Sequence, residues 1–392
     1  MILGDGSVVS WGDTSRGGDN AGVREELHDV RQIQATTCVF AAVRGDGSVV
    51  SWGRRWDDDD GVDTTVVREP LSDVQHIQAT DSAFAAILGD GSVVSWGNPR
   101  RGGDTNGVRE QLKDVRKIQA SSGAFAVIRG DGSVVSWGHQ GIGGDSTGVQ
   151  GQLQDVECIQ ANSGAFAAIL NNGSVVCWGH GPCGGDNNSV REQLRDVRHI
   201  QANAGAFAAI LGNGSVVCWG TPFCGGDTAH VQDELQDVQH IQATSHAFAA
   251  IRGDGSVVSW GSPASGGDQT HVQDQLQDVQ RIQANDQAFA ALLADGSVVS
   301  WGSPQCGGDN SGIHKLRLDV QHIQANEFAF AALLADGSVV SWGNRFSGGD
   351  SRPVQNQLRD VRHIQANGNS FAAIRGDGSV VSWGVSRTPC LD

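Results

Sequence analysis

The chain has 392 residues, and 44 Asp and Glu against 27 Lys and Arg give it a formal net charge of -17. Such an acidic balance argues against binding to a nucleic-acid phosphate backbone, which depends on Lys and Arg, and it also disfavours anionic membranes. The sequence contains no run of 18 apolar residues, so it predicts no membrane span. Residues 1–12 resemble the repeat and not a secretory signal. We therefore expect an intracellular protein, cytoplasmic or nuclear.

A Ser/Cys-Trp-Gly signature dominates the chain and recurs every 41 residues, with one interval of 44. Its tryptophans are Trp11, Trp52, Trp96, Trp137, Trp178, Trp219, Trp260, Trp301, Trp342 and Trp383. A fixed period near 40 residues is typical of propellers and solenoids, in which one unit must stack on the next to bury its apolar face.

The period predicts one repeat array over residues 1–392, without a linker. We expect a partial unit at 1–12, full units near 13–53, 54–97, 98–138, 139–179, 180–220, 221–261, 262–302, 303–343 and 344–384, and a tail at 385–392.

Within a representative unit the pattern predicts four short strands. The first is Val238–Ala243 and the second is Ala247–Ile251, small and apolar. The Asp-Gly turn at 253–255 then leads into a third strand, Ser256–Trp260. A more polar fourth strand is expected at His271–Leu276.

The succession of FAAI, GDGSVVSWG and a glycine-rich loop resembles the regulator of chromosome condensation repeat family. That resemblance implies an all-β propeller of four-stranded antiparallel blades, typically seven in the family, and the repeats of this chain predict about nine short blades. The units are shorter than is usual for the family, and the family's longer loop is reduced to Gly-Gly-Asp, as at 143–145. The insertion that a guanine-nucleotide exchange factor uses has no counterpart, so exchange activity is poorly supported.

The repeat count leaves the closure of the array open. We count nine first strands and nine second strands but ten third strands, because residues 1–12 supply one without its partners. A closed propeller is favoured, and an open spiral or solenoid of the same units is the alternative. In either case the spare terminal strand could support self-association.

Three features that recur along the chain are interpreted as structural. The tryptophans are expected to pack where units meet, although a tryptophan photosensor is an alternative. The Gln of each IQA segment is expected to bond to the backbone of an adjacent strand or to line a channel, with a ring of amides around a ligand as the alternative. The Asp of each Gly-Gly-Asp loop is expected to stabilise an Asx turn rather than bind Ca²⁺.

Departures from the repeat supply the candidate sites. An insertion in the second unit gives a candidate partner-binding loop, made of Arg54, Arg55, Trp56, Asp57, Asp58, Asp59 and Asp60. Four cysteines occur as two pairs with the same spacing, Cys177 with Cys183 and Cys218 with Cys224. Local disulfides or a thiolate zinc site are possible interpretations of these pairs, but the spacing is weak for zinc, so no metal and no cofactor are predicted.

No nucleophile elbow, phosphate-binding loop or zinc-protease motif is present, so the chain is not expected to be an enzyme. The predicted function is a protein-interaction scaffold, a docking module of the kind that the resemblance associates with ubiquitin ligases or GTPase regulators. Its protein partners are unknown. The alternative is a structural subunit of a large assembly or filament.

Overall fold

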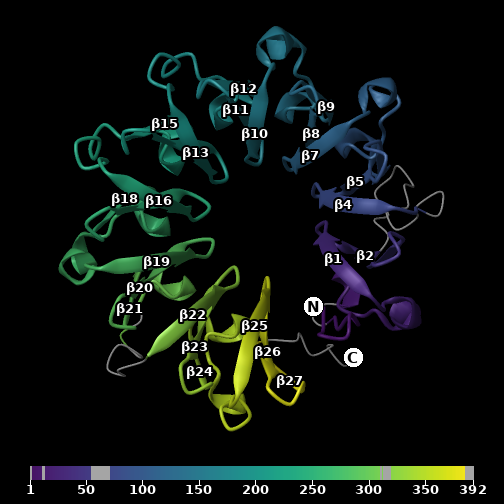
Figure 1. The fold of residues 1–392 in the computed structure, drawn as a ribbon. Helices are drawn as coiled ribbons and strands as arrows, with labels where there is room; N and C mark the ends of the chain where they lie inside the picture. The colour runs from purple at the N-terminus through teal and green to yellow at the C-terminus, as the bar shows by residue number, and fades with distance from the viewer. Residues whose placement is uncertain (1, 11–13, 54–70, 310, 312–318, 385–392) are drawn as a thin grey trace, which may run out of the picture. The chain divides into compact units, whose positions relative to one another are not determined.

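A computed structural model describes residues 2–10, 14–53, 71–309, 311 and 319–384 of the chain. It divides into two compact units, Met1–Val197 and Arg198–Asp392. In the described residues it contains nine three-stranded antiparallel sheets, each in the order first, second, third strand (Figure 1). The all-β prediction is confirmed. A single array with the predicted unit boundaries, and the choice between closed propeller and open spiral, stay predictions.

The first strands are β1 Val30–Ala35, β4 Val74–Ala79, β7 Val115–Ala120, β10 Val156–Ala161, β13 Val197–Ala202, β16 Val238–Ala243, β19 Val279–Ala284, β22 Val320–Ala325 and β25 Val361–Asn367. The second strands are β2 Val39–Arg44, β5 Ala83–Leu88, β8 Ala124–Arg129, β11 Ala165–Leu170, β14 Ala206–Leu211, β17 Ala247–Arg252, β20 Ala288–Leu293, β23 Ala329–Leu334 and β26 Ser370–Arg375. The third strands are β3 Val49–Gly53, β6 Val93–Gly97, β9 Val134–Gly138, β12 Val175–Gly179, β15 Val216–Gly220, β18 Val257–Gly261, β21 Val298–Gly302, β24 Val339–Gly343 and β27 Val380–Gly384.

Short 3-10 helices connect these sheets. They are η1 Thr14–Arg16, η2 Ala21–Glu26, η3 Pro99–Arg101, η4 Arg109–Gln111, η5 Gln140–Ile142, η6 Thr147–Gln152, η7 Gly181–Cys183, η8 Pro222–Cys224, η9 Pro263–Ser265, η10 Thr270–Gln275, η11 Pro304–Cys306, η12 Arg345–Ser347 and η13 Arg352–Val354.

The sheet β16–β18 shows why the sequence folds this way. The small apolar residues of β17 are buried on both faces, as predicted, because the preceding sheet covers one face and the following sheet covers the other. The turn between β17 and β18 places Gly255 at φ 78°, a conformation that favours glycine. Asp254 Oδ1 closes the turn by accepting from the amide and the hydroxyl of Ser256, at 3.0 and 2.6 Å.

The predicted fourth strand is wrong. Residues 270–275 form the 3-10 helix η10 instead, and each sheet has three strands. The physical reason is local hydrogen bonding at the start of this segment. The carboxylate of Asp268 accepts from the amide of Thr270 at 2.9 Å, and the carbonyl of Gln269 accepts from the amide of Val272, also at 2.9 Å, so the backbone turns instead of extending. Leu276, which follows the helix, is completely buried.

Within each compact unit, neighbouring sheets bury their facing sides against one another. In one such cluster, Ala247, Ala249 and Val257 of one sheet pack against Phe289 and Trp301 of the following one. The nine described tryptophans of the signature are at most 5% exposed. Each stacks on the phenylalanine directly opposite on the second strand, with ring centroids 5.2–5.4 Å apart. The packing role predicted for the tryptophans is therefore confirmed at these nine positions.

Hydrogen bonds also join neighbouring sheets. The indole nitrogen of Trp301 donates to the carbonyl of Gly266 in the preceding Gly-Gly-Asp loop, at 3.0 Å. The amide of Val279 donates to the carbonyl of Gly255 in the preceding hairpin turn, also at 3.0 Å. Trp96 is an exception, since its indole nitrogen finds no acceptor among the described residues. Stacking thus rests on both apolar burial and directional bonds.

The hairpin turns predict how stability depends on pH. Hydrogen bonds from a serine hydroxyl, and then from the serine amide, hold the pKa of seven turn carboxylates below the usual range: Asp5, Asp46, Asp90, Asp131, Asp254, Asp336 and Asp377. A carboxyl whose folded-state pKa is lowered stabilises the fold above its unfolded pKa, near 4, and this contribution is lost as pH falls further.

We therefore expect the urea midpoint to fall most steeply below about pH 4. The combined variant Ser92→Ala, Ser256→Ala, Ser338→Ala removes three of the hydroxyl donors, so its midpoint should fall less over the same range. Equal midpoints at pH 3 and pH 7 for the unmodified protein would contradict this assignment.

Candidate functional site

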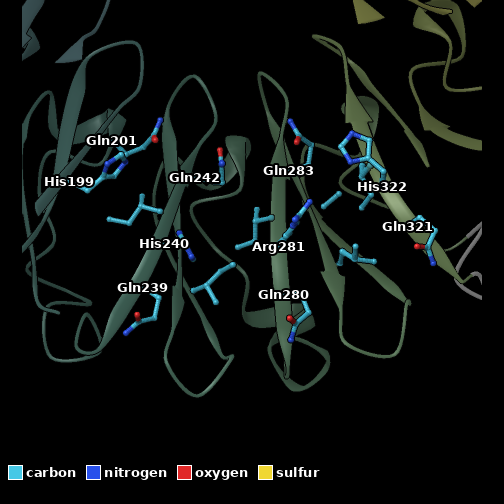
Figure 2. A pocket seen from close by; sticks show the side chains of 16 residues that line it. His199, Gln201, Gln239, His240, Gln242, Gln280, Arg281, Gln283, Gln321 and His322 are labelled. Atoms are coloured by element: carbon cyan, nitrogen blue, oxygen red, sulfur yellow. The ribbon is translucent and has the colours of Figure 1, made fainter. Parts of the chain in front are cut away.

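A groove of about 780 Å³ runs across the first strands of the second compact unit. Within this unit, β16 contacts β19, β19 contacts β22, and β22 contacts β25, so the first strands of neighbouring sheets lie side by side (Figure 1). Side chains from β13, β16, β19 and β22 line the groove, together with residues of β17 and β20 (Figure 2). The site is therefore built by residues that are 41 positions apart in the chain.

The burial pattern of the first strand determines which side chains reach the groove. In β16, Val238 and Ile241 are buried against the core, while the two residues between them are exposed. The irregular register between Val238 and His240 interrupts strict alternation, so that both Gln239 and His240 face outward. Every first strand in this unit has the same register irregularity where its pairing is described, in β16, β19, β22 and β25.

The groove carries rows of equivalent side chains. His199, His240, Arg281 and His322 form one row, with one residue from each of four successive first strands (Figure 2). Amides flank this row on both sides: Gln201, Gln242 and Gln283 on one side, and Gln239, Gln280 and Gln321 on the other. Aliphatic side chains, Ile241, Ile282 and Leu292 among them, complete the lining.

The IQA glutamines that bond to backbone do so within their own strand, not to an adjacent strand as expected. The side-chain amide of Gln283 donates to the carbonyl of Ala284, the next residue, at 3.3 Å, and Gln201 and Gln324 do the same to Ala202 and Ala325. Gln201, Gln242 and Gln283 line the groove. A channel lined by all the IQA glutamines, or a ring of amides around a ligand, stays a prediction.

The charge of the groove contrasts with the charge of the chain. None of the residues that line it is an Asp or a Glu, although the chain has 44 of them. Carboxylates lie at its two ends instead. Asp237 and Asp319 accept from the amides of Gln239 and Gln321, at 2.9 and 3.2 Å, and Asp286 and Glu327 lie in the loops beyond the other end of the strands.

Burial affects the ionisation of the imidazole row. Burial lowers the pKa of His199, and the neighbouring His240 lowers it further because two positive charges repel. Burial in turn raises the pKa of Asp286 at the end of the groove. His199 therefore gains its proton at a lower pH than an exposed histidine does.

The candidate partner-binding loop lies outside the described residues. This applies to Arg54, Arg55, Trp56, Asp57, Asp58, Asp59 and Asp60, so the prediction for them stays a prediction.

The two cysteine pairs lie on third strands and in the 3-10 helices that follow. Cys177 and Cys218 are buried on β12 and β15, Cys183 is half-buried in η7, and Cys224 is buried in η8. None of the seven described cysteines forms a disulfide. In the described ranges, no three His, Cys, Asp or Glu side chains come together in a way that could hold a metal ion. Cys183 Sγ lies 3.2 Å from Nδ1 of His180.

The aspartates of the Gly-Gly-Asp loops act as the Asx interpretation expects. Each accepts a hydrogen bond at Oδ1 from the amide two residues on: Asp19, Asp104, Asp145, Asp186, Asp227, Asp268, Asp309 and Asp350. These carboxylates are therefore engaged locally, at the start of the turn or helix that follows.

The groove was not predicted from the sequence. A signal was available. In the five first strands of the second unit, the two residues after the opening valine are always Gln, Arg or His and never acidic. The groove also requires neighbouring sheets to lie side by side, which the sequence of one unit does not show.

Comparisons with known proteins leave the family open. No family model matches the chain, and no curated protein matches it. Among solved structures, Prp20p from Saccharomyces cerevisiae is 15% identical with a TM-score of 0.40, over 78% of this chain and 83% of that one. The ectodomain of the Physcomitrella patens receptor kinase CR4 is 16% identical with a TM-score of 0.39, over 70% and 74%. Human WBSCR16 is 15% identical with a TM-score of 0.37, over 82% and 94%. At these scores the likenesses do not decide the function.

Among the described residues, no helix is both long enough and apolar enough to span a membrane.

Proposed function

We propose that this protein is a non-enzymatic protein-interaction scaffold and that the groove across β13, β16, β19 and β22 is its docking surface. The observation that carries the proposal is the lining of the groove, in which amides, imidazoles and one guanidinium surround aliphatic side chains. Amides offer both donors and acceptors to a polypeptide backbone, and the aliphatic residues offer apolar area, which is the composition of a specific recognition site.

The stacked sheets support this role because they hold the groove residues in place. Each first strand is paired along its length with a second strand whose residues are buried, so a ligand meets a surface that needs little ordering. A preorganised surface binds more tightly because less conformational entropy is lost on binding. Docking to ubiquitin-ligase chains or GTPase regulators stays a prediction from the sequence resemblance.

Site-specific photocrosslinking in an extract of the source organism tests the proposal. A photoreactive residue replaces Gln280 in the groove in one variant, and Gln305 in η11, an exposed position outside the groove lining, in the other. We expect a discrete crosslinked protein from position 280 and a much weaker one from position 305. Crosslinks from position 305 alone, or equal crosslinks from both, would contradict the docking surface.

A further inference from the structure

The groove concentrates positive charge in an acidic protein. Its central row presents the guanidinium of Arg281 between the imidazoles of His240 and His322, with His199 beyond His240 (Figure 2). Arg198 precedes His199 on β13, and Arg362 and His363 occupy the same two positions on β25, next to β22. All of these side chains lie on first strands that carry no carboxylate.

The side chains of the central row are exposed, so they are accessible to a ligand, and Ile241, Ile282 and Leu292 line the groove with them. A cleft lined by one sign of charge also concentrates ions of the opposite sign. The amides on both sides supply hydrogen-bond donors for carboxylate oxygens.

We propose that the groove binds a short acidic polypeptide segment and that its affinity increases as the histidine row becomes protonated. This inference rests on the proposed function, since it names the partner class of the same surface. Arg281 supplies a permanent charge at any physiological pH. Histidine side chains as a class gain positive charge in mildly acidic solution, where Asp and Glu side chains of a ligand remain ionised.

The ends of the groove limit the length of the ligand. Asp237, Asp319 and Asp295 lie toward the end at which the first strands begin, and Asp286 and Glu327 lie toward the other. A long polyanion would extend past the cationic row and meet these carboxylates. A nucleic acid carries a charge at every phosphate, and its bases bind by stacking on aromatic side chains. The groove lining contains no Phe, Tyr or Trp. A short acidic peptide therefore fits the groove better than a nucleic acid does.

Fluorescence anisotropy with a labelled hexaglutamate peptide tests this inference in the full-length protein. Labelled hexaglutamine and labelled oligothymidylate serve as the neutral peptide and the nucleic acid. We expect hexaglutamate to bind, with an affinity that rises about tenfold from pH 7.5 to pH 5.5 and falls with added salt, and we expect the other two probes to bind at least tenfold more weakly.

Three variants locate the binding. Arg281→Gln should weaken hexaglutamate binding by about threefold to tenfold at both pH values. The triple variant His199→Gln, His240→Gln, His322→Gln should keep the affinity at pH 7.5 and lose the increase at pH 5.5. Arg345→Gln, which removes an exposed charge from η12 outside the groove lining, should change neither.

Binding that Arg345→Gln weakens as much as Arg281→Gln would overturn the proposal, because it would reflect net charge alone. Stronger binding of oligothymidylate than of hexaglutamate would assign the groove to nucleic acid instead. If no peptide binds but crosslinks still form at position 280, the docking function stands and the acidic ligand class fails.

Discussion

Replacing Trp260 by alanine is expected to cost about 3–5 kcal/mol of unfolding free energy, the range for losing a buried aromatic side chain. Trp260 has no exposed surface, it stacks on Phe248 at a centroid distance of 5.4 Å, and its indole nitrogen donates to the carbonyl of Gly225 at 3.1 Å. Alanine would leave a cavity between two sheets and an unpaired buried carbonyl. Urea denaturation followed by circular dichroism measures the loss.

Phe223→Ala provides the matched control, since it truncates another aromatic residue of the same unit. Phe223 is 62% exposed and makes a tilted contact with His246, so its loss should change stability by no more than about 0.5 kcal/mol. Similar losses in both variants would mean that the tryptophans do not hold the sheets together.

Gly266→Ala is expected to destabilise the protein by about 2–5 kcal/mol, because it combines backbone strain with a steric clash. Gly266 has φ 93°, a conformation that residues with a side chain rarely adopt. A Cβ atom there would lie 2.6 Å from Cδ2 of Phe289, in the ring that stacks on Trp301. The same denaturation experiment measures the effect.

Gly151→Ala is the control for this substitution. Gly151 lies in η6 and has open space around a Cβ position, and its φ is not positive. Alanine there should leave stability unchanged or raise it by up to about 1 kcal/mol, since it reduces the freedom of the unfolded chain. An equal loss at both glycines would refute the loop packing described above.

The strands could be predicted from one unit because their signals are local. The apolar run of β17, the Asp-Gly turn and the paired valines of β18 each specify their own conformation, and the structure places β16 at the predicted bounds of 238–243. The fourth strand failed because a segment with only two apolar residues fits either a strand or a turn of helix. The hydrogen bonds from the amides of Thr270 and Val272 to Asp268 and Gln269 stabilise the helix instead.

Contacts between units could not be predicted from the sequence of one unit. The bond from Trp301 to Gly266 spans 35 residues, and nothing in either local motif indicates it. Asp278 adopts φ 53° immediately before β19, and Gly255 of the preceding hairpin lies close to its backbone. Aspartate tolerates this left-handed conformation better than most residues, which explains why it recurs at this position. The sequence shows the recurring aspartate but not the neighbour that requires it.

The candidate site was harder to predict for the same reason. The insertion at 54–60 is a candidate site because it departs from the repeat, whereas the groove is formed by residues at equivalent positions of several repeats. His240 and Arg281 come together only because stacking aligns their strands. A comparison of charge at equivalent positions of all units, rather than a search for exceptions, would have indicated this surface.

A crystal structure of the full-length protein with bound hexaglutamate at pH 5.5 tests the central claim most directly, namely that stacked three-stranded sheets align their first strands into a binding groove. The account predicts peptide density along the groove, with carboxylates within hydrogen-bond distance of Arg281 and His240. Peptide bound elsewhere, or first strands of neighbouring sheets that do not lie side by side, would contradict it.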